Sequence, residues 1–108
     1  MVRGRMDAMS VTKARSMGLR DALELLGVYV GTDRDFQPQK DLQTARWIVS
    51  VPTGEFELLV TGAKWFDTRQ ARGGGGAIDL VMHVLGLSFF EAVKRLVAAS
   101  EVTSARTG

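Results

Sequence analysis

Apolar residues recur along the chain with two different periods, and the changes of period divide it into predicted elements. From Leu19 to Leu26 the spacings are four and three, as on one face of an amphipathic helix. We therefore expect a short helix there, ended by Gly27. Val28 to Val30 favour an extended backbone, and the polar stretch from Gly31 to Thr44 is expected to be a solvated loop.

Between Arg46 and Thr61 the period shortens to two, which predicts strands with one buried face. A turn at Pro52-Thr53-Gly54 makes this segment a β-hairpin, and a second turn at Thr61-Gly62 leads into a third antiparallel strand, Lys64-Trp65-Phe66-Asp67. We expect a sheet of three or four strands. The side chains predicted on the buried face of the hairpin are Trp47, Val49, Val51, Phe56, Leu58 and Val60.

The rest of the chain predicts two helices. Apolar residues at helical spacing run from Ala77 to Leu85, with Asp79 in the first turn, where the helix dipole favours a carboxylate. Ser88 and Glu91 have the spacing of a capping box, which predicts the start of a last helix that reaches about Ser100.

Together these elements predict one α+β domain, because 108 residues suffice for a single hydrophobic core. We expect a leading helix, a small antiparallel sheet and two packed C-terminal helices within residues 18–102. Residues 1–17 combine basic side chains with no sustained apolar period and are expected to form a flexible arm or a partly ordered lead-in. Residues 103–108 are expected to be a frayed tail.

Composition and charge indicate a soluble globular domain whose net charge is small. Apolar residues at 45% and charged residues at 24% are typical of soluble globular domains. Since no apolar segment has the length of a membrane span or the form of a signal peptide, we expect a cytoplasmic location. The net charge is +2, but residues 1–17 hold four basic residues against one acid, so the remainder sums to about −1. Binding to a polyanion would need local clustering of charge.

Reactive side chains are few. The chain has no cysteine and a single histidine, His83, which excludes disulfides and thiolate metal sites, so no metal or other cofactor is expected. Asp33, Asp35 and Asp41 share one loop but lack the glycine and closing glutamate of a calcium loop, which favours a solvated loop. No Gly-X-Ser-X-Gly or comparable nucleophile motif occurs, so we expect no enzyme activity.

The segment from Gly73 to Leu96, GGGGAIDLVMHVLGLSFFEAVKRL, combines a glycine-rich turn with two short helical stretches. It resembles the segment that closes the zinc-binding N-terminal domain of bacterial, plasmid and conjugative-element DNA primases. There the pattern is a glycine-rich turn, Ile-Asp-Phe/Leu-Val, then Gly-Leu-Ser-Phe and Glu-Ala. The matching positions here are Gly76, Ile78, Asp79, Leu80, Val81, Gly86, Leu87, Ser88, Phe89, Glu91 and Ala92.

The sequence departs from that family at the metal site. Zinc-bearing members hold the metal through Cys and His on the sheet hairpins, and this chain lacks those ligands. The resemblance therefore implies a metal-free variant with a zinc-ribbon-like fold over residues 18–100. It implies template binding in the DNA replication of a mobile element rather than catalysis. It also implies a primase, polymerase or other replication protein as the partner that supplies the chemistry.

Basic and aromatic residues of the sheet region are the expected contacts to single-stranded DNA or a primer–template. Lysine and arginine attract phosphates, and an exposed ring stacks on an unpaired base. Strand alternation exposes only one of Trp65 and Phe66. The glycine run offers backbone N–H groups to a phosphate at the start of a helix. The predicted nucleic-acid-binding residues are Arg46, Lys64, Trp65, Arg69, Arg72, Gly74 and Gly75.

Structural explanations compete with some of these assignments. The glycines are also typical of a tight turn from a strand to a helix. Asp79 is typical of the first turn of a helix, and His83 of a partly buried position on an apolar helix. The near-neutral charge after residue 17 favours another function, a protein-interaction module that docks on a replication or mobile-element protein through its final helices.

Overall fold

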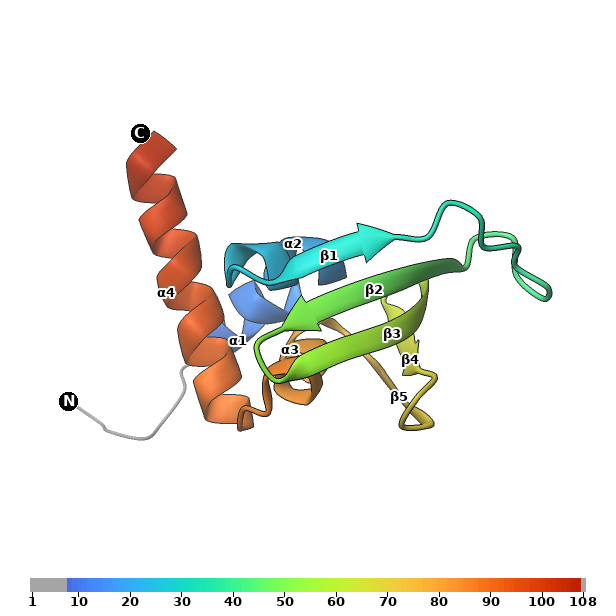
Figure 1. Ribbon diagram of the computed structural model, residues 1–108. Helices are drawn as coiled ribbons and strands as arrows, with labels where there is room; N and C mark the ends of the chain where they lie inside the picture. Colours follow the sequence, from blue (N-terminus) through green and yellow to red (C-terminus); the bar gives the residue numbers. More distant parts are fainter. Residues whose placement is uncertain (1–7, 108) are drawn as a thin grey trace.

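Five antiparallel strands form one sheet, in which each strand pairs with the next one along the chain (Figure 1). The structure, a computed structural model, describes residues 8–107, and side chains as far as residue 102. The described elements are α1 (Ala8–Arg15), α2 (Leu19–Leu25), β1 (Tyr29–Thr32), β2 (Ala45–Val51), β3 (Gly54–Thr61), β4 (Lys64–Asp67), β5 (Arg72–Gly75), α3 (Ala77–Leu85) and α4 (Phe89–Thr107). The predicted α+β class is confirmed, with more strands than expected.

Two tight turns set the register of the central strands. The Pro52-Thr53 turn joins β2 to β3, which confirms the predicted hairpin. The turn at Gly62, whose φ of 62° favours glycine, joins β3 to β4 and places Val60 opposite Trp65. Opposite residues of antiparallel strands share a face of the sheet, so this turn decides which side chains of β4 point inward.

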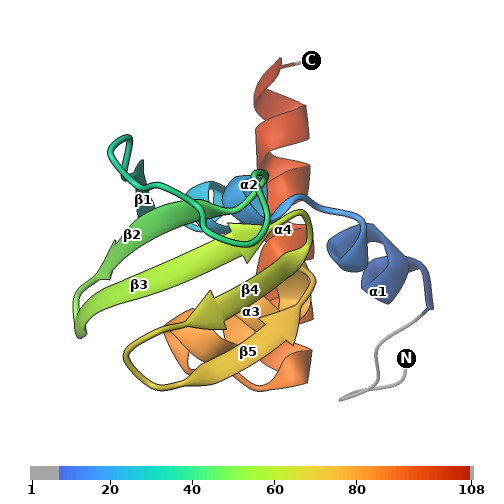
Figure 2. The ribbon, with the colours of Figure 1, turned by 90° about the vertical axis from the view of Figure 1, so that its right-hand side faces the viewer.

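One face of the sheet is covered by helices and holds the core (Figure 2). Helices α2 and α3 lie against this inner face, and α4 packs across both of them. The predicted buried side chains of the hairpin all lie on it, fully or partly buried. Each fully buried aliphatic side chain stabilises the fold by about 1.5–3 kcal/mol. Those with almost no exposed surface are Leu23, Val49, Leu58, Leu80, Val81, Val93 and Leu96.

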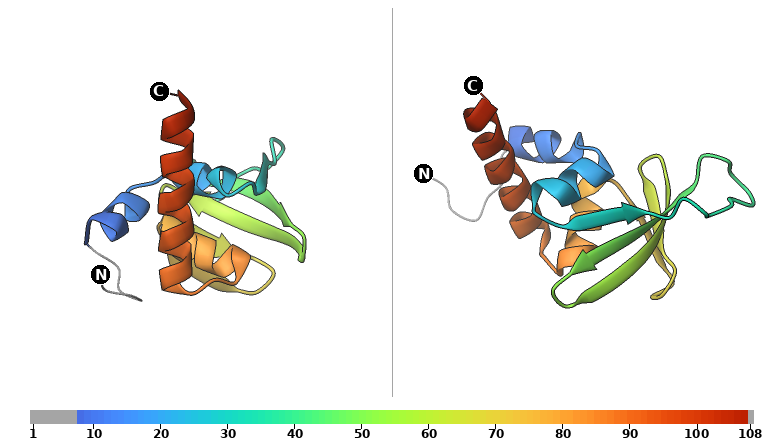
Figure 3. Two further views of the ribbon diagram at one scale, coloured as in Figure 1. Left: turned by 90° about the vertical axis from the view of Figure 1, so that its left-hand side faces the viewer. Right: turned by 45° about the horizontal axis from the view of Figure 1, so that its top comes forward.

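The two C-terminal helices begin where the sequence predicts. Gly86 ends α3 in the left-handed conformation, with φ 66° and ψ 36°. The backbone N–H of Glu91 donates to Ser88 Oγ at 3.1 Å, which confirms the predicted cap of α4. Helix α4 continues past Ser100 to Thr107, so the backbone of the expected tail is helical, and its last turns extend beyond the other elements (Figure 3). No helix in the described part of the chain is long and apolar enough to span a membrane.

Part of the predicted N-terminal arm is a helix. Helix α1 packs against α4 and α3, with Ala14 fully buried and Val11 and Met17 partly buried. These residues form a narrow stripe centred on a small alanine, which gives the sequence too weak an apolar period to predict a helix. The arm prediction is therefore wrong for residues 8–17. The first seven residues, with Arg3 and Arg5, lie outside the described part of the chain.

The edge strands β1 and β5 complete the five-stranded sheet. Arg20 of α2 covers the outer edge of β1, where it donates to Val30 O at 2.8 Å and to Thr32 Oγ1 at 3.0 Å. Strand β5 contains Arg72 and three glycines, a composition that weakens strands and that predicts a turn instead. Its pairing with β4 brings the glycine backbone over the inner-face side chains of that strand.

Candidate functional site

A buried aspartate–histidine pair joins the sheet to helix α3. Asp67, at the end of β4, is fully buried, and its Oδ2 lies 2.7 Å from Nε2 of His83. Its Oδ1 accepts hydrogen bonds from the backbone N–H groups of Arg69 at 2.9 Å and Gln70 at 3.0 Å. Because an ionised carboxylate only accepts hydrogen bonds, Nε2 of His83 carries a proton. These bonds explain how two polar side chains can be buried in the core.

Aromatic rings enclose this pair. The Trp65 ring stacks on the His83 imidazole with centroids 5.0 Å apart, and the Phe56 ring meets it edge-on at 5.6 Å. Burial raises the pKa of Asp67, but the hydrogen bonds from His83 and from the two backbone N–H groups outweigh that effect and hold the pKa below its ordinary value of 3.8. Asp67 is therefore ionised at neutral pH although it lies in the core.

The position of Trp65 corrects its assignment as a stacking platform for nucleic acid. Trp65 shares the inner face with Val60, and only 3% of its surface is exposed. Phe66, the next residue in β4, points to the opposite face and is 43% exposed. The ring that a ligand can reach is therefore that of Phe66.

One glycine of the run, Gly74, packs against Trp65. A methyl group on Gly74 would overlap Oδ2 of Asp79 and would lie 2.5 Å from Cζ2 of Trp65. The backbone N–H of Gly75 already donates to Oδ2 of Asp79 at 3.0 Å. Gly76 follows as the N-cap of α3, with a φ of 85°. Gly74 is therefore closely packed, and the N–H of Gly75 already has a partner in Asp79, so neither contact supports the assignment of these two glycines to a phosphate site.

We expect Gly74→Ala to destabilise the protein by about 1–3 kcal/mol, because the added methyl group overpacks the space between Trp65 and Asp79. Gly75→Ala is the matched control, since a methyl group there meets no atom closer than 3.8 Å. Urea unfolding followed by tryptophan fluorescence measures both variants. Equal unfolding midpoints for the two would contradict the packing role of Gly74.

A small hollow of about 230 Å³ adjoins the start of α3, where Arg15, Gly76 and Asp79 contribute to its wall. Helix N-termini attract anions, and the Asp79 carboxylate already lies in the first turn of this helix. The hydrogen bond from Gly75 to Asp79 agrees with the interpretation of Asp79 as a helix-start residue.

Arg46 and Arg69 lie on the outer face of the sheet, the face away from the helices, and both contact acids. Arg46 lies 2.6 Å from Asp33 and 2.5 Å from Glu57. Arg69 lies 3.8 Å from Glu55 and 3.9 Å from Glu57. The hydrogen bonds with Glu57 and Asp33 raise the pKa of Arg46, and the hydrogen bond from Arg46 lowers the pKa of Glu57.

We call these five side chains the ion-pair network. Its two arginines face three carboxylates, so its formal charge is −1. Arg46 and Arg69, two of the predicted nucleic-acid-binding residues, therefore bring no net positive charge to the outer face, since their charge is more than balanced by their neighbours. Arg72 is exposed at the start of β5, opposite Asp67, and it takes no part in the network.

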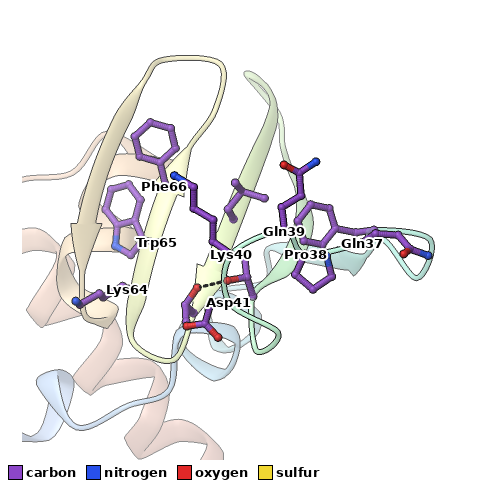
Figure 4. Close-up of a pocket in the computed structure, with 12 residues that line it drawn as sticks. Gln37, Pro38, Gln39, Lys40, Asp41, Lys64, Trp65 and Phe66 are labelled. Atoms are coloured by element: carbon purple, nitrogen blue, oxygen red, sulfur yellow. Dashed lines mark hydrogen bonds between the residues drawn. The ribbon is translucent and has the colours of Figure 1, made fainter.

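A second feature of the outer face is a pocket of about 650 Å³ between the loop of residues 33–44 and strands β3 and β4 (Figure 4). We call it the outer-face pocket. Leu59 of β3 and Phe66 of β4 provide apolar surface. Lys64 lies on its β4 side, and Lys40 extends from the loop across the pocket toward Phe66 (Figure 4).

The outer-face pocket also contains an aromatic ring that lies close to the sheet, and a polar wall. The Phe66 ring lies against Gly73. A methyl group at Gly73 would lie 3.2 Å from Cδ1 of Phe66, so the absence of a side chain there lets the ring lie close to the sheet. Thr44 and Thr61 are joined through their hydroxyl oxygens, 2.7 Å apart, and thereby fix the end of the loop to β3. Gln37 and Gln39 add amide groups from the loop.

Of the predicted binding residues, the structure places only Lys64 at this pocket with its side chain available. Lys40 was not among the predicted residues. It lies in a polar loop, and the sequence pattern does not show against which strand such a loop packs. Proline at position 38 and the glutamines beside it indicate a loop but give no position for it. For the exposed ring, strand alternation left two candidates, Trp65 and Phe66, and did not decide between them.

The described residues include no group of three or more His, Asp or Glu side chains that could hold a metal ion. The outer-face pocket is therefore the strongest candidate site in the described part of the chain. Comparisons with protein-family models, with curated proteins and with solved structures found no match to this sequence or fold.

Proposed function

We propose that this domain binds single-stranded nucleic acid at the outer-face pocket and performs no chemistry of its own. One observation carries the proposal: the exposed ring of Phe66 and the side chain of Lys40 come together in one pocket on the open face of the sheet, and Lys64 lines the same pocket. An accessible ring beside cationic side chains is the combination that binds unpaired bases and their phosphates without strict sequence preference.

The distribution of charge supports the pocket over the rest of the outer face. The charged residues that line the pocket are Lys40, Lys64 and Asp41, so its formal charge is +1. The neighbouring ion-pair network has a charge of −1. A phosphate is therefore attracted to the pocket and repelled by the network.

The resemblance of Gly73–Leu96 to primase zinc-binding domains gives the proposal its context. It favours a template strand as the ligand, in the replication of a mobile element, with a primase or polymerase partner that carries out nucleotidyl transfer. The exposed apolar residues of α4 give less support to a docking surface for proteins. Phe89 and Val102 are exposed, but they lie about 20 Å apart along the helix and form no continuous patch.

The proposal predicts that Lys40→Ala combined with Lys64→Ala weakens the binding of a single-stranded oligonucleotide and reduces its salt dependence. Each lost phosphate contact lowers the slope of log K against log salt by about 0.7. We therefore expect a slope smaller by about 1.4, measured by fluorescence anisotropy between low and moderate salt. Lys94→Ala is the control, because Lys94 lies over Phe90 on α4, away from the outer face. Equal slopes for both variants, or no binding by the intact chain, would contradict the proposal.

A further inference from the structure

We infer that the outer-face pocket accepts a single nucleotide unit, with its base on Phe66 and its phosphate at Lys40 and Lys64, and that the strand does not continue across the sheet. This inference rests on the proposed function and names its ligand: a nucleoside 5′-phosphate, either free or as one unit of a strand. Three observations support it, namely the size of the pocket, the charge around it and the groups that line it.

The pocket has the dimensions of a small-molecule site. Its volume of about 650 Å³ falls within the range of about 300–1,000 Å³ typical of such sites. The loop of residues 33–44 forms one wall, and hydrogen bonds hold both ends of that loop. At one end Asp33 N donates to Arg46 O at 2.8 Å, and at the other Thr44 bonds to Thr61. A walled pocket of this kind differs from an open groove, in which a strand lies across several nucleotides.

The charge beside the pocket limits the path of a strand. Glu57 is the member of the ion-pair network nearest to Phe66, because it lies on the adjacent strand β3, two residues from Leu59, the partner of Phe66. Sheet spacings place their backbones about 8 Å apart, with Arg46 on β2 beyond. Glu55 and Glu57 place their carboxylates in that network and are only partly neutralised. A strand that left the pocket toward β2 would bring its next phosphates against this negative surface.

The groups of the pocket match the parts of one nucleotide. Phe66 offers an exposed ring for one base. Two more aromatic residues line the pocket, but Phe36 of the loop is half-buried and Trp65 is buried. Lys40, which extends toward Phe66, provides a cation for the phosphate, and Lys64 adds positive charge to the wall of the pocket for a group of charge between −1 and −2. The hydroxyl groups of Thr44 and Thr61 and the amides of Gln37 and Gln39 are hydrogen-bonding partners for the sugar or the base edge.

The test uses the full chain and compares AMP, CMP and UMP with single-stranded oligonucleotides of 4, 8 and 12 residues. Competition against a labelled 12-mer gives each dissociation constant, which is then expressed per nucleotide. A second stacked base would tighten binding by at least about fivefold. We expect the per-nucleotide constants to agree within that factor, and we expect Phe66→Ala to abolish competition by the mononucleotides.

The outcomes separate this inference from the proposed function. Oligonucleotide binding that tightens steeply with length, without competition by millimolar mononucleotide, would overturn the single-nucleotide site and leave nucleic-acid binding intact. Binding of mononucleotides alone would support the site and overturn the proposed function. Absence of binding by both ligands would overturn both. Glu55→Lys provides a further check, because it replaces a negative charge of the ion-pair network by a positive one and should make 12-mer binding tighter while mononucleotide binding stays unchanged.

Discussion

Replacement of Asp67 by alanine is expected to destabilise the protein by about 3–5 kcal/mol, because three donors lose a fully buried acceptor and each such loss costs about 1–3 kcal/mol. The carboxylate accepts hydrogen bonds from His83, Arg69 and Gln70 and is fully buried. Its removal leaves Nε2 of the buried His83 side chain and two partly buried backbone N–H groups without their acceptor. Since single domains have a total stability of about 5–15 kcal/mol, this loss is a large fraction of it.

Urea unfolding at neutral pH measures the effect of Asp67→Ala. Glu101→Ala is the control, because Glu101 is an exposed acid on α4, and such changes usually stay within about 0.5 kcal/mol. Asp67→Asn should lose an intermediate amount of stability. Its amide oxygen still accepts from the two backbone N–H groups, but its NH₂ group faces His83 and cannot accept a hydrogen bond from Nε2. A loss below about 1 kcal/mol for Asp67→Ala would show that the pair contributes little.

The same pair predicts the direction of the pH dependence of stability. The folded pKa of Asp67 lies below its ordinary value of 3.8, so the folded state binds protons less readily at this carboxylate than the unfolded chain does. Its contribution is therefore present above pH 3.8 and is lost as the pH falls below that value toward the folded pKa. The Asp67→Asn variant should lack this part of the acid sensitivity.

Phe66→Ala is expected to weaken oligonucleotide binding by about 5- to 150-fold, which corresponds to about 1–3 kcal/mol for one stacked base. Tyr29→Ala is a closely matched control. Tyr29 is also an exposed ring on the outer face and also lies against a glycine, Gly31, but it belongs to β1 and does not line the pocket. We expect its removal to change binding less than twofold, about 0.4 kcal/mol.

Two further measurements separate stacking from folding. Phe66→Trp should retain binding, because a larger aromatic ring preserves the stacking surface, whereas Phe66→Leu preserves only apolar area. The unfolding midpoint of Phe66→Ala should remain close to that of the parent protein, since the ring is 43% exposed. Equal binding losses for Phe66→Ala and Tyr29→Ala would argue against a ring-specific site.

The central elements of the fold were predictable because local rules determine them. The short turn at Gly62 pairs Thr61 with Lys64, and this register alone places Trp65 on the inner face. The sequence therefore contains the information that Phe66 is the exposed ring, provided that the turn length is used to assign the register. The caps at Gly86 and Ser88 likewise depend on neighbouring residues only.

The remaining features depend on contacts between distant segments. Asp67 alternates onto the inner face, so a charged residue there indicates a buried partner, but its identity as His83 depends on how α3 is rotated against the sheet. The local charge around Arg46 and Lys40 likewise depends on segments that are distant in the sequence. Arg46 is balanced by acids from a loop and from β3, and Lys40 reaches the pocket only because the loop folds over β3 and β4.

The central claim is that the outer-face pocket is the place where nucleic acid binds, and amide chemical-shift mapping tests it most directly. On titration of the ¹⁵N-labelled chain with a single-stranded oligonucleotide, we predict that shifts concentrate in β4 from Lys64 to Phe66 and in the loop from Phe36 to Asp41, while β1 and α4 stay unchanged. Shifts confined to the start of α3 or to α4, or no shifts at saturating oligonucleotide, would contradict this account.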